Sequence, residues 1–302
     1  MKTLWRLSIA AAIAAFGEVM LGSWTRIQGA GMTCPDWPHC NGRWIPSLAG
    51  GTVWEWAHRL SALLLSVFVA GIIAVAWRRR KAPLIGPAMA AVSALFVFQI
   101  ALGAATVRLS NSPASVVWHW GTAMAFIASL AMLGIFAQAN ASGRVRHGDE
   151  QGVHTTAFIV LALTASIAFV TMCVGAYVSS SGAGLACLSI PGCSGGVVVY
   201  TPGQIVQMVH RLLAAATLLC AAGACAAVWV WNCDARVRVT ASAGLALVFV
   251  QVLLGLLNVA FRLPIDLREA HAANAALTFL TFVGAATFAS LDVRTVERSP
   301  AP

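Results

Sequence analysis

The sequence predicts an all-α polytopic membrane protein, with eight transmembrane helices arranged as two pseudo-symmetric four-helix bundles. The first observation behind this prediction is the composition. Of 302 residues, 59% are hydrophobic and only 10% are charged, and the mean hydropathy is +0.81. Typical soluble domains contain about 25% charged residues. The second observation is that the apolar residues fall in eight long runs, and the third is that the chain repeats itself once.

Each apolar run is long enough to cross a bilayer as a helix, which takes roughly 20 residues. The first run continues past the length of a signal peptide and contains Glu18, so we expect it to be a retained span. The predicted spans cover approximately residues 7–26, 54–77, 84–107, 116–139, 155–178, 204–231, 238–261 and 270–291.

The basic residues predict the orientation of the spans, because cytoplasmic loops of membrane proteins are enriched in Lys and Arg. With both termini in the cytoplasm, twelve of the 19 basic residues lie on the cytoplasmic side. Both cysteine-containing loops then lie outside a bacterial plasma membrane, and lipid surrounds the chain. The net charge of +9 is therefore a topology signal and does not indicate a nucleic-acid partner. The twelve residues are Lys2, Arg6, Arg78, Arg79, Arg80, Lys81, Arg144, Arg146, Arg236, Arg238, Arg294 and Arg298.

The two halves of the chain resemble each other. GAGMTCPDWPHC at 29–40 aligns with GAGLACLSIPGC at 182–193, at an offset of 153 residues. Each half contains four spans, so the halves share one orientation and form parallel repeats about an axis along the membrane normal. The predicted domains are an N-terminal half at 1–141, a cytoplasmic linker at 142–152 and a C-terminal half at 153–302. Four pairs recur at an offset of 152, namely His58 and His210, Gln99 and Gln251, Gly103 and Gly255, and His119 and His271.

Four of the seven histidines obey the repeat, and each lies near the outer end of the second or fourth span of its half. Helix bundles build cofactor sites from side chains on facing helices. The pairs His58 with His119 and His210 with His271 therefore each suit a haem iron with two axial ligands. Two histidines are few for a zinc or copper site. The alternative is that all four are helix-end histidines bonded to water or backbone.

Neighbours of the histidines distinguish the halves. Arg59 and Arg211 each follow a predicted ligand and are candidates for pairing with haem propionates. Glu55 shares a helix face with His58, whereas Gln207 takes the equivalent place in the second half. A carboxylate there indicates a proton acceptor or a group that stabilises positive charge. The alternative is a first-turn glutamate favoured by the helix dipole.

Glu18, inside the first span, has no carboxylate counterpart in the second half. An ionisable residue inside a membrane span suggests function by default. The sequence leaves two interpretations open for it, a buried polar contact and a role in a proton path.

GAGMTCPDWPHCNG, the WEWAHR stretch that holds Glu55 and His58, the second cysteine pair and the repeated histidines resemble the haem A synthase family. The subtype is one with cysteine pairs in the outer loops, and the resemblance covers nearly the whole chain. Members oxidise a ring methyl group of haem O to a formyl group, via a hydroxymethyl intermediate, for cytochrome oxidase assembly. The resemblance implies a haem b cofactor held by His210 and His271. It also implies haem O as substrate between His58 and His119, with Glu55 as the catalytic residue at the reacting edge.

The cysteines form two sets. Cys34 and Cys40, like Cys187 and Cys193, are predicted on the outer, oxidising side, where disulfides persist. A disulfide in each pair is the favoured interpretation, with a four-cysteine zinc site and redox-active thiols as alternatives. The five-residue gap within each pair is wider than the usual zinc spacing of about two to four. The other four are interpreted as packing thiols, namely Cys173, Cys220, Cys225 and Cys233.

Two other functions fit the histidines, a di-haem b-type membrane electron carrier and a haem-binding transporter or chaperone. Neither of these two functions requires the carboxylate of Glu55. If the chain is an enzyme of this family, it needs an electron acceptor that the sequence does not identify. The family also implies a membrane-bound haem O synthase as a possible partner, and a homo-oligomer is left open.

Overall fold

The computed structural model describes residues 1–143, 155–193, 196 and 199–291, and helices dominate this part of the chain. Eight α-helices coincide with the eight predicted spans, and each is long and apolar enough to cross a membrane. The predicted all-α membrane fold is therefore confirmed. The helices are α1 (Lys2–Ile27), α2 (Thr52–Trp77), α3 (Ile85–Arg108), α4 (Pro113–Ala141), α5 (Thr155–Ser180), α6 (Pro202–Val230), α7 (Ala235–Ala260) and α8 (Ile265–Ala289), with a 3₁₀ turn η1 (Ala183–Leu185) after α5.

Some helices begin earlier than the apolar runs. α1 begins at Lys2 and α8 at Ile265, where the runs predicted starts near positions 7 and 270. Charged residues at the membrane boundary lower hydropathy without ending a helix. In α8 the first turn contains Asp266, a residue type that the positive end of the helix dipole favours. α6 begins at Pro202 behind a capping box, in which Thr201 and Gln204 accept each other's main-chain N–H.

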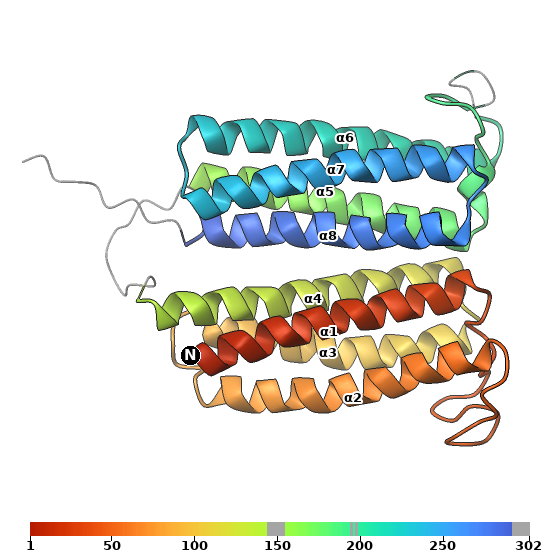
Figure 1. Cartoon of the computed structure of the whole chain (residues 1–302), viewed down its shortest axis with the longest axis horizontal. Coiled ribbons are helices and arrows are strands. Elements are labelled where there is room, and N and C mark those ends of the chain that lie inside the picture. Colours follow the sequence, from red (N-terminus) through yellow and green to blue (C-terminus); the bar gives the residue numbers. More distant parts are fainter. Residues whose placement is uncertain (144–154, 194–195, 197–198, 292–302) are drawn as a thin grey trace, which may run out of the picture.

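The helices form two groups, α1–α4 and α5–α8, that lie next to each other (Figure 1). In the first group α1 and α3 each contact both α2 and α4, and in the second α5 and α7 each contact both α6 and α8. Each group is thus a ring of four helices, in which α2 lies diagonally across from α4 and α6 diagonally across from α8. Inward-facing side chains of two diagonal helices can therefore meet at the centre of the bundle.

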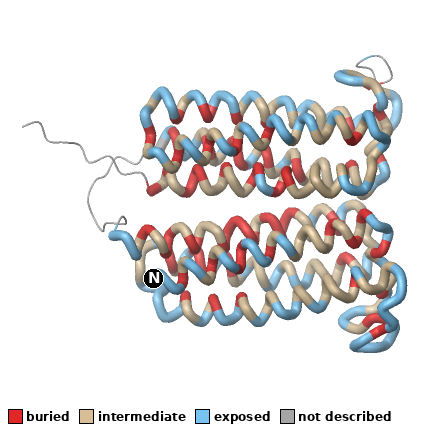
Figure 2. Tube along the Cα trace, in the orientation of Figure 1, coloured by how far each residue is buried: buried red, intermediate tan, exposed pale blue. Residues whose placement is uncertain are grey.

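Three helix pairs join the groups, namely α4 with α5, α1 with α8, and α4 with α8. α4 is the most buried of the eight helices, since it has neighbours on both sides (Figure 2). A two-fold axis would exchange the first two pairs and keep the third. These contacts are of the kind that the predicted pseudo-symmetry requires, and the symmetry itself stays a prediction.

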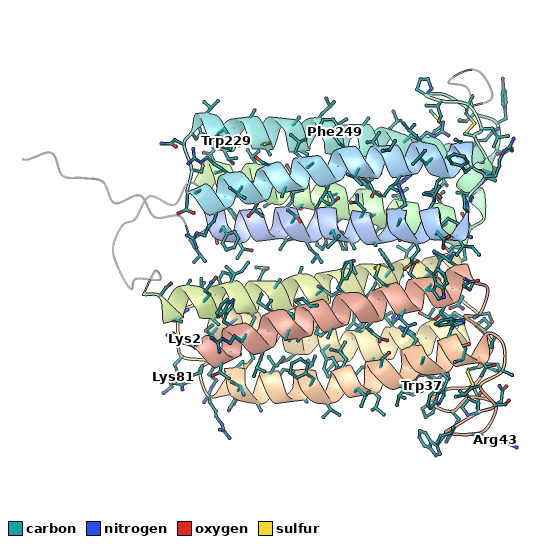
Figure 3. All side chains as sticks on the ribbon, in the orientation of Figure 1. Lys2, Trp37, Arg43, Lys81, Trp229 and Phe249 are labelled. Atoms are coloured by element: carbon teal, nitrogen blue, oxygen red, sulfur yellow. A yellow bond between two sulfur atoms is a disulfide. The ribbon has the colours of Figure 1, made fainter. Side chains whose placement is uncertain are left out.

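The outer faces of the helices are apolar. On α2, Leu63, Leu64 and Val67 are 61–69% exposed, as expected for side chains that contact lipid rather than water. The loop 28–51 and the segment 181–193 lie at one end of the molecule (Figure 1), where Figure 3 labels Trp37 and Arg43. Lys2 and Lys81 lie at the opposite end (Figure 3).

Part of the predicted organisation lies outside the described residues. This concerns positions 144–152 of the linker and four of the basic residues used for the orientation, namely Arg144, Arg146, Arg294 and Arg298.

Candidate functional site

The four repeated histidines lie inside the helices, at matching depths. His58 and His119 are each the seventh residue of their helices, α2 and α4, and His271 is the seventh of α8. His210 is the ninth residue of α6. At about 1.5 Å per residue, all four lie roughly two turns from the loop end. These four helices start two to five residues before the predicted spans, so the histidines lie correspondingly further from the helix ends than predicted.

The C-terminal pair meets in the centre of its bundle. The ring centroids of His210 and His271 lie 6.4 Å apart, with their planes inclined by 72°. An imidazole nitrogen binds a metal ion at about 2 Å, so this separation accommodates one ion between the rings. His58 and His119 occupy the corresponding helices of the first half. The residues present therefore fit the haem iron that the sequence predicted.

A glycine on a neighbouring helix lies against each histidine ring. A Cβ atom at Gly22 would lie 2.7 Å from Cε1 of His58, and one at Gly175 would lie 2.9 Å from Cε1 of His210. Such distances are shorter than real side chains adopt, so a larger residue would displace the ring. Gly103 and Gly255 lie beside the other two rings at a looser distance, each with its Cβ position 3.4 Å from Cε1 of His119 and His271, respectively, which is an ordinary van der Waals contact.

Two glutamines contact the histidines of α4 and α8. The amide nitrogen of Gln99 lies 3.1 Å from Nδ1 of His119, and that of Gln251 lies 3.1 Å from Nε2 of His271. Nδ1 of His271 is buried without a hydrogen-bond partner. A buried nitrogen of this kind is costly unless a ligand or another partner satisfies it, which agrees with a metal ion at this ring.

The helix before each of α2 and α6 places a polar oxygen against Nδ1 of the histidine, as an ion-pair contact for His58 and a hydrogen bond for His210. Oε1 of Glu18 in α1 lies 2.6 Å from Nδ1 of His58. In the second half the main-chain oxygen of Thr171 in α5 lies 3.1 Å from Nδ1 of His210. Of the two interpretations left open for Glu18, the structure contains a polar contact, and a role in a proton path stays a prediction.

Glu55 is buried, with 4% of its surface exposed, and it faces the first cysteine loop. Its Oε2 accepts hydrogen bonds from the Thr33 hydroxyl at 2.9 Å and the Cys34 main-chain N–H at 2.8 Å. Its Oε1 accepts from Arg59 at 2.8 Å. Both carboxylate oxygens of Glu55 therefore accept hydrogen bonds that stabilise the first cysteine loop. The position of Glu55 on the same helix face as His58 did not predict these bonds.

Gln207 does the same in the second loop. Its side-chain oxygen accepts the Cys187 N–H at 2.5 Å, and its nitrogen donates to the Gly184 carbonyl at 2.8 Å. Anchoring the first cysteine of each loop is therefore common to Glu55 and Gln207. The negative charge is what only Glu55 supplies.

The two arginines hold the main chain of the loops. Arg59 donates to the carbonyls of Asp36 at 2.7 Å, His39 at 2.5 Å and Cys34 at 2.7 Å. Five donors on one planar group suit such a set of carbonyls. Pairing of Arg59 and Arg211 with haem propionates stays a prediction.

Arg211 repeats the arrangement, with carbonyls of the second loop as acceptors. It donates to Ser189 at 2.7 Å, Gly192 at 2.6 Å and Cys187 at 2.8 Å. These three residues are the repeat counterparts of the acceptors of Arg59.

Disulfides close both loops, Cys34 with Cys40 and Cys187 with Cys193. The favoured interpretation of the outer cysteines is thereby confirmed over the zinc site. The other four cysteines are not disulfide-bonded. In the first loop, Asp36 accepts the N–H of Asn41 and Gly42. These bonds, chiefly that from Gly42, hold the pKa of Asp36 below its ordinary value.

Polar groups also bridge the two halves near the loop end. Nη2 of Arg26 donates to the Ser179 hydroxyl at 3.1 Å, and the Ser23 hydroxyl donates to Glu269 at 2.8 Å.

Comparison with known proteins decides the family. A family model described as "Cytochrome oxidase assembly protein" (COX15-CtaA) matches residues 5–50 and 48–283. The chain belongs to this family. The expected membership in the haem A synthase family is also supported by individual relatives.

A haem A synthase of Bacillus licheniformis is 30% identical over 285 residues, which cover 90% of this chain and 91% of that protein. A haem A synthase of Shewanella oneidensis is 25% identical and covers 94% and 95%, respectively. Family membership, as expected from the cysteine loops and histidines, is confirmed.

A third relative matches in part. A protoheme IX farnesyltransferase of Halobacterium salinarum is 29% identical over 150 residues, 47% of this chain. The matched region is 33% of the farnesyltransferase, so the chain spans about a third of that relative's length. The match concerns a segment of that protein and not its whole activity.

Proposed function

We propose that this chain is a haem A synthase, which oxidises a ring methyl group of haem O to a formyl group through a hydroxymethyl intermediate. The observation that carries the proposal is the similarity to haem A synthases over nine-tenths or more of the chain. The two histidine pairs, each held across a bundle, support it because they suit two haem groups in one molecule.

The C-terminal half, 153–302, is proposed to hold haem b as resident cofactor. His210 and His271 would bind its iron, since their rings face each other at a separation that fits one ion. Bound there, haem b supplies one-electron transfer. Gln251, Thr171 and Gly175 keep the two rings in place.

The N-terminal half, 1–141, is proposed to bind the substrate. His58 and His119 would face the iron of haem O, and Glu55 would lie at the reacting edge of the ring. Each oxidation of the methyl carbon adds the oxygen of one water and releases two electrons and two protons. The first gives the hydroxymethyl group, the second gives a hydrate, and loss of water leaves the formyl group.

Glu55 is proposed to accept a proton from the attacking water or to stabilise positive charge at the ring methyl. Its hydrogen bonds to Thr33, Cys34 and Arg59 fix the carboxylate beside the first loop. The charge, and not the anchoring, is the part of Glu55 that the second half lacks.

The setting of the enzyme is also proposed. The chain is a multi-pass membrane protein, and we place it in the bacterial plasma membrane with the disulfide loops outside and both termini in the cytoplasm. An electron acceptor must receive the electrons. A haem O synthase is a fitting donor of substrate, because a farnesyltransferase that acts on protohaem, by its name, shares a segment with this chain.

The test is expression of the chain with a source of haem O, followed by extraction and chromatography of the haems. Haem A, or its hydroxymethyl precursor, is the expected product. Unaltered haem O together with haem b would overturn the proposal and favour an electron carrier or a haem transporter.

A further inference from the structure

Glu18 is an acidic residue inside a transmembrane helix, and neither the fold nor the proposed reaction requires a carboxylate at this position. Its side chain is 12% exposed, and Oε1 lies 2.6 Å from Nδ1 of His58, whose side chain is 27% exposed. The Ser61 hydroxyl donates to its other oxygen. Both oxygens of the carboxylate are thus contacted by α2, one by His58 and the other by Ser61, about one turn further along the helix.

The second half has the same contact with a different acceptor. Thr171 lies 153 residues after Glu18, which is the offset of the cysteine loops and of the glycines Gly22 and Gly175. Its main-chain oxygen, 3.1 Å from Nδ1 of His210, takes the place of the carboxylate. The two bundles therefore present a negatively charged acceptor to one histidine and a neutral acceptor to the other.

The acceptor on Nδ1 decides how an imidazole binds a metal ion. A ring that donates Nδ1–H leaves Nε2 as the ligand atom, and the bond fixes the orientation of the ring. A carboxylate makes the ring a stronger electron donor than a carbonyl does. A stronger donor stabilises the oxidised iron, and hydrogen bonding to the ligand is one of the ways a protein sets the reduction potential of a haem.

We propose that Glu18 is a positioning residue for His58, and that its charge gives a haem in the N-terminal site a lower reduction potential than the neutral Thr171 contact would. The inference rests on the proposed function, since it requires haem at both histidine pairs. The two halves would then differ in the electron-donating strength of one histidine ligand, as well as in having Glu55 or Gln207 beside the cysteine loop. A more easily oxidised iron on the substrate side favours passage of electrons toward the resident haem.

The experiment uses the purified full chain and iron protoporphyrin IX as the probe, because this molecule shares the iron and ring of haem O. Haem affinity and a spectroscopic redox titration are measured for the wild type, Glu18→Gln and Glu18→Ala. Glu18→Gln keeps a hydrogen-bond acceptor without the charge and so imitates the second half. The resident haem at His210 and His271 is an internal control for folding in every variant.

In Glu18→Gln we expect the N-terminal haem to become easier to reduce, while the midpoint of the C-terminal haem stays at the wild-type value. In Glu18→Ala we expect its affinity to fall about tenfold, as for other partners of metal-binding histidines. An N-terminal midpoint that is equal in all three proteins overturns the role of Glu18 and leaves the proposed function standing. A wild type that binds no second haem overturns both.

Discussion

Arg26 donates a hydrogen bond to Ser179, the residue that takes its own place in the second half of the chain, 153 positions later. Residues at equivalent positions of two symmetry-related halves contact each other where they lie beside the two-fold axis. An arginine on one side and a serine on the other also show that the halves have diverged where they meet. We expect the two halves to differ in function at the positions where their residues differ.

Glu55→Gln should separate catalysis from anchoring, because Gln207 shows that a glutamine can hold the cysteine N–H. We expect Glu55→Gln to keep its haem b and its loop structure and to leave haem O unconverted. Glu55→Ala should also weaken the loop, since an unpaired buried N–H costs about 1–3 kcal/mol. The checks are chromatography of extracted haems and limited proteolysis of the loop. Wild-type yield of haem A from Glu55→Gln would reduce Glu55 to an anchor.

The two histidine pairs should differ in what they retain on purification. His210→Ala and His271→Ala are expected to lose the resident haem b, because one axial ligand cannot hold a six-coordinate iron. His58→Ala and His119→Ala are expected to keep it and to lose haem O binding. The haem-to-protein absorbance ratio checks the first expectation, and haem O titration checks the second. Loss of haem b from His58→Ala would contradict the assignment of the halves.

Gly22 and Gly175 should be intolerant of a methyl group. Gly175→Ala is expected to displace His210 and lower haem b content, whereas Gly22→Ala is expected to displace His58 and lower haem A yield about tenfold or more. Gly17→Ala is the matched control in α1, since a Cβ there meets nothing within 4 Å. Equal haem A yields from Gly17→Ala and Gly22→Ala would contradict the contact.

Replacing Arg59 or Arg211 by lysine should loosen the corresponding loop. A lysine ammonium cannot reach three carbonyls at once, and hydrogen bonds to charged groups contribute about 1.5–3 kcal/mol each. We expect hydrogen exchange of the amides in that loop to rise at least tenfold, which corresponds to about 1.4 kcal/mol. Unchanged exchange with weaker haem binding would instead support the predicted pairing with propionates.

Acid should affect the first loop and spare the second. The pKa of Asp36 is lowered by the N–H groups it accepts, so its stabilising effect is complete above the ordinary value of about 3.9. That effect is lost as the pH falls through the lowered value. Exchange of the Gly42 amide should therefore rise below about pH 4, and Asp36→Asn should remove the dependence. Ser189 takes this place in the second loop, so the same acid dependence there would contradict the explanation.

The spans and the histidine pairs could be predicted because both depend on patterns within one helix. An apolar run predicts a span by itself, and the offset between His58 and His210 predicts equal depth in two similar bundles. The contact of Glu18 with His58 could not be predicted, because it depends on how α1 slides and rotates against α2. The acceptors of Arg59 are main-chain carbonyls, which no pattern of residue types contains.

The sequence does contain one signal for the contact of Glu18 with His58. Gly22 and Gly175 share the offset of the cysteine loops, 153 residues, while the later histidines differ by 152. Aligning the first helices by the loop offset places the two glycines in register. It also aligns Glu18 with Thr171, and so indicates where the two halves differ in charge.

The arginines that hold the disulfide loops contact main-chain oxygens, so this support does not depend on which side chains the loop residues carry. Four of the five residues enclosed by Cys34 and Cys40 differ from those enclosed by Cys187 and Cys193. Between the two halves, the identity of these side chains was able to drift while the course of the backbone stayed in place. Selection can therefore alter the surface that each loop presents without having to rebuild the support beneath it.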